Sequence, residues 1–147
     1  MIESDNFADL FLILKVLADK KLNLPDVGNE SKSTILAKND DNIKFELVVN
    51  RKGHKNPDNL TYQMVSLKPR RLIIRLDVSG APHLNPNGEQ IPTPHVHIFN
   101  EEYMQGKIAI PLEDLTDLRL VSRLHESIRF FLDYNNVDTT SVLIPAI

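Results

Sequence analysis

The chain has 147 residues, of which 25% are charged, with a formal net charge of −3 and no cysteine. This length suits a single domain over residues 1–147 that folds without a disulfide or a structural metal. The lack of cysteine excludes disulfide scaffolds, thiolate metal sites and a cysteine nucleophile. Without a long apolar run either, the sequence predicts a cytoplasmic protein that makes no use of a membrane.

The first predicted element is a helix over residues 4–20, which Ser4 or Asp5 could cap. Its apolar side chains recur at spacings of three and four residues: Phe7, Leu10, Phe11, Leu14 and Leu17. Three further apolar residues widen this face, so the helix is expected to lie against a sheet. Residues 21–31, which include Pro25 and Gly28, are predicted to form a loop.

Strands are predicted next, at residues 34–38, 43–51, 60–67, 71–78 and 93–99, with a short sixth one at 107–110. Short links between strands favour antiparallel neighbours, hence a meander. A long loop rich in turn-forming residues covers 79–92.

The C-terminal part changes from strand to helix periodicity. We expect a helical turn within 112–118 and a helix over 122–135, followed by an apolar tail, 139–147, that docks on the domain or on a second copy to form a homodimer. The predicted fold class is α+β: an antiparallel sheet of five or six strands with the N- and C-terminal helices packed on one face.

Five polar side chains form the most informative cluster of the sequence. In a strand, residues i and i+2 share a face. Arg75 and Asp77 therefore point to one side, as do His95 and His97, and pairing of the two strands would bring all four together. The loop between the strands adds His83.

Three kinds of chemistry could use this set. The first is acid–base cleavage of a phosphodiester, in which histidines exchange protons, Arg75 stabilises phosphate charge and Asp77 orients a histidine. The second is a metal site on His95 and His97 with His83 or Asp77 as third ligand. The third is a structural polar network that pins the loop to the sheet. We assign Arg75, Asp77, His83, His95 and His97 as candidate catalytic residues and predict no metal or other cofactor.

A basic stretch precedes the cluster. Residues 51–75 carry a local charge of +6 in a chain whose remainder carries −9. Such a stretch is either an ordinary solvated hairpin or a surface for phosphate groups of RNA or another ligand. The candidate phosphate-binding residues are Arg51, His54, Lys55, Arg70 and Arg71. His54 and His83 both open a His-x-Asn-Pro pattern, which marks turns.

Two resemblances follow from these motifs. With its Gly53-His54-Lys55-Asn56-Pro57 loop and its segment from Arg75 to His97, the chain resembles a small uncharacterised family of Gram-positive bacteria and their phages, which implies no activity. Residues 75–97 alone, with Asp77, Ala81-Pro82-His83 and Pro94-His95-Val96-His97, also resemble TumE-type toxins of toxin–antitoxin systems. That resemblance implies an RNA-directed, growth-inhibiting module centred on Asp77 and the three histidines.

Two functional hypotheses remain open from the sequence. One is a toxin-like module that handles phosphodiesters of nucleic acid at the His/Asp/Arg cluster. The other is a non-catalytic binding or regulatory protein, from a prophage, in which the cluster is structural or contacts a protein partner.

Overall fold

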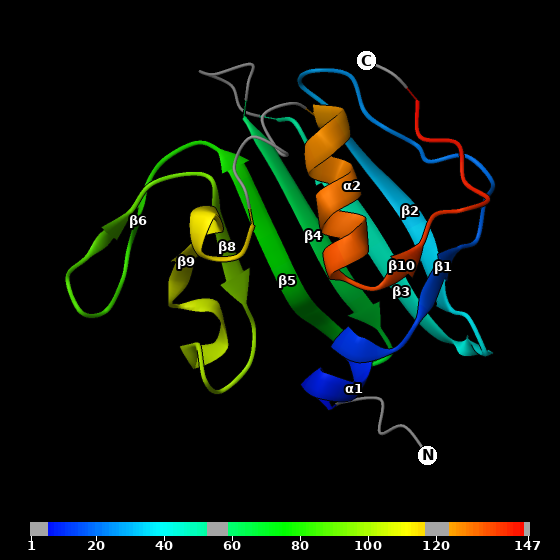
Figure 1. Cartoon of the computed structure of the whole chain (residues 1–147), viewed down its shortest axis with the longest axis horizontal. Helices are drawn as coiled ribbons and strands as arrows, with labels where there is room; N and C mark the ends of the chain where they lie inside the picture. The colour runs from blue at the N-terminus through cyan, green and yellow to red at the C-terminus, as the bar shows by residue number, and fades with distance from the viewer. Residues whose placement is uncertain (1–5, 53–58, 117–123, 146–147) are drawn as a thin grey trace.

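The computed structural model describes residues 6–52, 59–116 and 124–145 and is dominated by one eight-stranded sheet (Figure 1). The strand order is β10-β1-β2-β3-β4-β5-β8-β9. The strands are β1 (Lys15–Leu17), β2 (Glu30–Ala37), β3 (Asp40–Asn50), β4 (Leu60–Leu67), β5 (Arg70–Ser79), β8 (His95–Ile98), β9 (Ala109–Pro111) and β10 (Val137–Asp138). Neighbours are antiparallel except β1 and β10, which pair in parallel at one edge. The predicted antiparallel α+β class is confirmed, whereas the count of five or six strands was too low.

The N-terminal segment departs most from its prediction. The helix α1 covers only Phe7–Leu12, with Asn6 as its cap, and residues 15–17 form strand β1 instead of a continued helix. Both of the predicted caps lie outside the described residues. Lys15 is fully buried and pairs with Val137 and Ala37, so contacts with distant strands decide the conformation here. A short apolar run fits a helix or a strand equally well when periodicity alone is considered.

One face of the sheet carries the hydrophobic core. Phe45, Leu47 and Val49 of β3 alternate inward and continue across the sheet through Tyr62 and Met64 of β4. The helix α2 (Leu124–Tyr134) lies over this face (Figure 1) and buries Ile128, Phe131 and Leu132 against it. Tyr62 stacks on Phe131 and shares a 2.6 Å hydrogen bond with Ser127. These contacts attach α2 to the centre of the sheet.

The placement of the helices differs from the prediction that both pack along one face. Only α2 lies across the sheet, whereas the six-residue α1 sits at one end of it, near the C-terminal end of α2 (Figure 1). Phe11 of α1 contacts Tyr134 of α2, with ring centroids 5.6 Å apart, and Leu10 is fully buried. The short helix therefore closes one end of the core.

The C-terminal tail docks on its own chain over the residues that the structure describes. Leu143 forms a parallel bridge with Lys21, in which the backbone of Leu143 bonds the residues on either side of Lys21. Ile144 is buried in the core. The side chain of Leu143 is 62% exposed. A homodimer through this tail stays a prediction.

The long loop before β8 holds a small hairpin, β6 (His83–Leu84) and β7 (Gln90–Ile91), that lies apart from the main sheet (Figure 1). Toward the C-terminus, two single-turn 3-10 helices, Met104–Gly106 and Leu112–Asp114, flank β9, and the second confirms the turn expected within 112–118. Among the described residues no helix is long and apolar enough to span a membrane.

Candidate functional site

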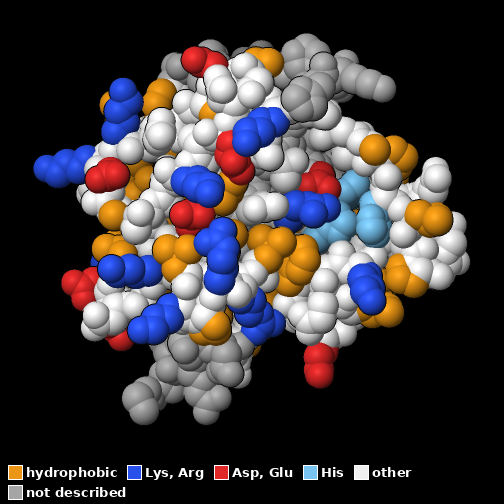
Figure 2. Space-filling view, turned by 180° about the vertical axis from the view of Figure 1, so that it is seen from behind, with side chains coloured by type: hydrophobic (Ala, Val, Ile, Leu, Met, Phe, Trp, Pro, Cys, Tyr) orange, Lys and Arg blue, Asp and Glu red, His pale blue; other side chains and the backbone are white. Residues whose placement is uncertain are grey.

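The predicted polar cluster assembles on the sheet face opposite α2. β5 and β8 pair with Asp77 opposite His95 and Arg75 opposite His97. Their neighbours Leu76 and Val96 are buried in the core on the other side. Figure 2, which views the molecule from behind Figure 1, shows the histidines in one group beside acidic and basic side chains. Period-two geometry predicted that the residues of each strand share a face, and the two strands do pair, as the cluster requires.

Asp77 is the centre of the cluster. Its Oδ2 lies 3.0 Å from His95 Nε2 and 3.3 Å from His97 Nε2. Arg75 donates two hydrogen bonds to the same carboxylate, from Nε to Oδ1 at 2.8 Å and from Nη2 to Oδ2 at 3.0 Å. The histidine side chains are only 1% and 2% exposed, against 16% for Asp77 and 32% for Arg75. The two histidines thus form the buried floor of the site, and Asp77 and Arg75 lie at its rim.

The carboxylate of Asp77 is strongly favoured in its charged form. Burial by itself raises the pKa of Asp77, but its contacts with His95, His97 and Arg75, together with the positive charge of Arg75, outweigh burial and hold the pKa well below its usual range. Asp77 is therefore an anion throughout the neutral pH range and can act as an acceptor or a ligand.

Backbone carbonyls contact one ring nitrogen of each buried histidine. His97 Nδ1 lies 2.8 Å from the Gly106 carbonyl oxygen, and His95 Nδ1 lies 3.2 Å from those of Ile91 and Pro92. A carbonyl oxygen only accepts, so Nδ1 of His97 is the donor, whereas His95 also has its Nε2 within 3.0 Å of Asp77 Oδ2, a second oxygen that only accepts. In a neutral His97 imidazole, Nε2 then carries a lone pair that points toward Asp77, whereas Nε2 of His95 shares a hydrogen bond with that carboxylate. The sequence suggested that Asp77 orients a histidine, and here Asp77 and the backbone carbonyls both contact the rings.

His95 Nε2 and His97 Nε2 both face the negative Asp77 carboxylate, so positive charge is required between these three groups. One solution places a hydrogen on each Nε2, so that both histidines donate to Asp77. The other solution is one cation bound by all three atoms. Asp77, His95 and His97 offer ligand atoms that lie within 4.8 Å of one another, the one such group of three among the described residues.

His83 completes the predicted set from the loop. Its ring packs edge-to-face on His97, with centroids 4.8 Å apart, and its Nε2 lies 2.7 Å from the Lys107 carbonyl oxygen. It is more exposed than the two strand histidines and does not belong to the group whose ligand atoms converge. His83 therefore lies beside the group formed by Asp77, His95 and His97 and is not part of it.

Two further residues position this region: Asn85, which the loop was expected to add to the cluster with His83, and Gly106, which the sequence did not single out. Buried Asn85 clamps the loop to β9, since its side chain accepts from Ala109 N at 2.8 Å and donates to Ala109 O at 3.1 Å. Gly106, whose carbonyl holds His97, has a φ of +86°, and a Cβ there would overlap the Phe99 ring. A Gly in a sequence signals such a need only weakly, and Asn-Pro signals only a turn.

A polar pocket of about 430 Å³ opens next to Asp77. Asn50, Thr61 and Asp77 lie opposite one another on β3, β4 and β5, so they form one row across its floor. Lys52 and Thr93 also line it. The pocket gives a ligand access to the exposed edge of the cluster.

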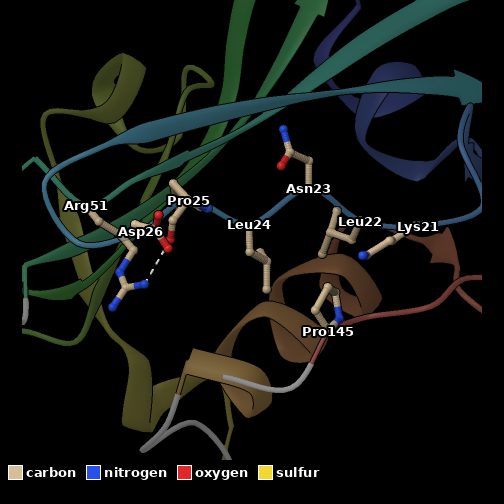
Figure 3. Close-up of a pocket in the computed structure, with 8 residues that line it drawn as sticks. All are labelled: Lys21, Leu22, Asn23, Leu24, Pro25, Asp26, Arg51 and Pro145. Carbon is tan, nitrogen blue, oxygen red and sulfur yellow. Dashed lines mark hydrogen bonds between the residues drawn. The ribbon is translucent and has the colours of Figure 1, made fainter.

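The three predicted phosphate-binding residues that the structure describes do not gather at the cluster. Arg51 follows the end of β3 and donates to the Pro25 carbonyl oxygen at 2.9 Å, in a separate pocket near Pro145 (Figure 3). At the opposite end of the sheet, Arg70 pairs with Glu46 at 3.7 Å and Arg71 donates to the Phe99 carbonyl oxygen at 3.0 Å. His54 and Lys55 lie outside the described residues.

The fold and site define an α+β protein with a buried His/His/Asp centre under a clamped loop. A family model matches residues 2–137, so the chain belongs to DUF6978, a family of unknown function. This confirms the expected membership of an uncharacterised family; the resemblance to phage proteins and to TumE-type toxins stays a prediction. No curated protein and no solved structure gives a significant match.

Proposed function

We propose that this chain binds and cleaves a phosphodiester, with RNA as its substrate, at the pocket beside Asp77. The observation that supports this most is the convergence of Arg75, His95 and His97 on one carboxylate at the rim of an open polar pocket. A guanidinium next to proton-accepting groups is the combination that phosphoryl chemistry requires.

Arg75 is suited to bind the phosphate. A guanidinium has five N–H donors, and two of those of Arg75 bond Asp77. Within the described part of the chain the other three have no protein partner, so they are available to phosphate oxygens. The Asp77 carboxylate holds the guanidinium in place, which limits the entropy lost when a ligand binds.

The sheet face around the pocket favours a polyanion. Lys and Arg side chains are spread over this face, with acidic side chains between them (Figure 2). By strand register, Lys32 and Lys44 belong to it and both are exposed. Cations distributed in this way attract a phosphate backbone without reading its sequence.

The proposed reaction uses the buried centre as base and His83 as acid. The Asp77 carboxylate at the rim accepts the proton of the ribose 2′-hydroxyl and passes it to His97 Nε2, 3.3 Å away, while the ribose oxygen forms a new bond to phosphorus. The bond from phosphorus to the 5′-oxygen breaks, and that oxygen takes a proton from His83. The products are a 2′,3′-cyclic phosphate and a 5′-hydroxyl end. Arg75 stabilises the charge that develops on the phosphate oxygens.

Incubation of the purified protein with labelled RNA and with DNA of the same sequence tests this proposal. We expect cleavage of RNA with cyclic phosphate ends, and a loss of about 10²–10³-fold in rate for Arg75→Ala. His83→Ala is expected to lose about 10²–10⁴-fold. DNA lacks the internal nucleophile and is expected to remain intact.

Lys32→Ala is the matched control for Arg75→Ala. Lys32 belongs to the same row of strand partners, three strands from Arg75, which is roughly 14 Å away at the usual strand spacing. Its loss should weaken RNA binding only slightly and leave the cleavage step unchanged. Absence of RNA cleavage by the folded wild-type protein, or equal rates for Arg75→Ala and Lys32→Ala, would overturn the proposal.

A further inference from the structure

We propose that Asp77, His95 and His97 bind one divalent transition-metal ion, of the chemistry of Zn²⁺, through Asp77 Oδ2 and the two histidine Nε2 atoms. The inference deepens the proposed function, because the ion would lie where the substrate phosphodiester is expected. Metal binding is measured without RNA, so either proposal can fail while the other stands.

The separations between the ligand atoms fit a small ion. Tetrahedral zinc with bonds of about 2.0–2.1 Å places its ligand atoms roughly 3.3 Å apart. Asp77 Oδ2 lies 3.0 Å from His95 Nε2 and 3.3 Å from His97 Nε2, and all three atoms fall within 4.8 Å of one another.

The second observation is an unsatisfied nitrogen. His97 is 2% exposed, and its Nε2 is buried without a hydrogen-bond partner even though it faces Asp77. Buried polar atoms in folded proteins rarely lack a partner, and each exception calls for an explanation. Nδ1 of the same ring carries the hydrogen that the Gly106 carbonyl accepts, so Nε2 presents a lone pair. A metal ion supplies the missing partner.

The surroundings of the histidines also match those of metal ligands. Ligating histidines usually donate their second ring N–H to a carboxylate or a backbone carbonyl, which fixes the ring and raises its basicity. His95 does so toward Ile91 and Pro92, and His97 toward Gly106. Arg75 in turn bonds the carboxylate of the third ligand. All three ligands are thus held in position before the ion arrives.

The donor set determines the class of ion. Two imidazoles and one carboxylate suit Zn²⁺ and its first-row neighbours, whereas Mg²⁺ and Ca²⁺ prefer sites made only of oxygen. Three protein ligands leave a coordination position for water or substrate, as in catalytic zinc sites. Because Asp77 lines the pocket, that position is close to bound substrate. A metal-bound hydroxide there would be the base of the proposed cleavage.

Isothermal calorimetry of chelator-treated protein with Zn²⁺ tests the inference, and Co²⁺ titration followed by visible absorption reports the geometry. We expect one ion per chain and, for Co²⁺, the intense absorption of a four-coordinate site. His97→Gln and Asp77→Asn should each weaken binding by more than about 100-fold, beyond the usual effect of residues outside the coordination sphere. Circular dichroism establishes that each variant is folded. If one does not fold, His95→Gln replaces it.

Two matched control substitutions alter residues near the site that supply none of the three ligand atoms. Glu46→Gln neutralises a carboxylate on the same sheet face, and His83→Gln removes the histidine whose ring packs on His97. Both are expected to bind Zn²⁺ within a few-fold of wild type. Failure of the wild-type protein to bind Zn²⁺ or Co²⁺, or equal binding by Asp77→Asn and Glu46→Gln, would disprove the site.

Discussion

Asp77 on β5 and His95 on β8 lie directly opposite each other, and their side chains meet with Oδ2 and Nε2 3.0 Å apart. The strand pairing that forms this contact also brings Arg75 opposite His97. One register therefore places four functional side chains together. A loop clamp and a glycine support the region around them, and a buried lysine supports the far side of the sheet.

Zinc is expected to stabilise the fold. A ligand that binds only the folded state stabilises it by about 2.7 kcal/mol at a free concentration 100 times its dissociation constant. Thermal unfolding followed by circular dichroism should show a rise in the melting temperature of wild type with Zn²⁺ and its reversal by chelator. Asp77→Asn should show no such rise. An equal shift with Mg²⁺ would contradict a site built on two imidazoles.

Gly106→Ala is expected to destabilise the protein and disturb His97. The backbone at Gly106 has a φ of +86°, and the new methyl group would also overlap the Phe99 ring. Gly28→Ala is the matched control, because Gly28 has a φ of +90° but open space around its Cβ position. We expect about 1 kcal/mol of loss at Gly28 from strain alone and at least about 2 kcal/mol more at Gly106. Urea unfolding measures both, and equal losses would refute the steric contribution.

Asn85→Ala is expected to release the loop from β9. It removes both hydrogen bonds between the Asn85 side chain and Ala109 and leaves buried backbone groups without partners, at a cost of about 1–3 kcal/mol. Hydrogen exchange of the Ala109 amide should accelerate. Asn87→Ala, which alters an exposed residue of the same loop, should leave that amide unchanged. Slow exchange in Asn85→Ala would show that the clamp is unimportant.

Lys15→Met is expected to lower the free energy of unfolding by about 2–4 kcal/mol at neutral pH. Lys15 Nζ donates to the carbonyl oxygens of Phe11, Ile13 and Asn135 at 2.9, 3.1 and 2.8 Å, which would all lose their donor. Lys38→Met removes an exposed lysine that pairs with Asp138 and should cost less than about 0.5 kcal/mol.

The free energy of unfolding is also expected to depend on pH through Lys15. Burial lowers the pKa of Lys15 from 10.5 to about 7. Between these values the unfolded chain binds more protons than the folded one, so stability rises with pH. The advantage of wild type over Lys15→Met should therefore grow by on the order of 1 kcal/mol per unit between pH 7 and pH 10. A constant difference across this range would show that the buried lysine stays charged.

Much of the site could be predicted from local spacing. Alternation placed Arg75 with Asp77 and His95 with His97, whereas the pairing of their strands was a condition that the structure meets. The central strands β3, β4 and β5 were predicted within a few residues, because each shows strand periodicity between clear turn signals.

The sequence by itself determined which side chains share a face, since that depends only on the period of a strand. Tertiary structure alone decided that residues 15–17 are a strand, because Lys15 pairs there with Val137, more than a hundred residues away. It also decided that Gly106 and Ile91 supply the carbonyls that aim both histidine Nε2 atoms at Asp77. Backbone carbonyls are present at every residue, so only the folded path of the chain determines which of them meet a given ring.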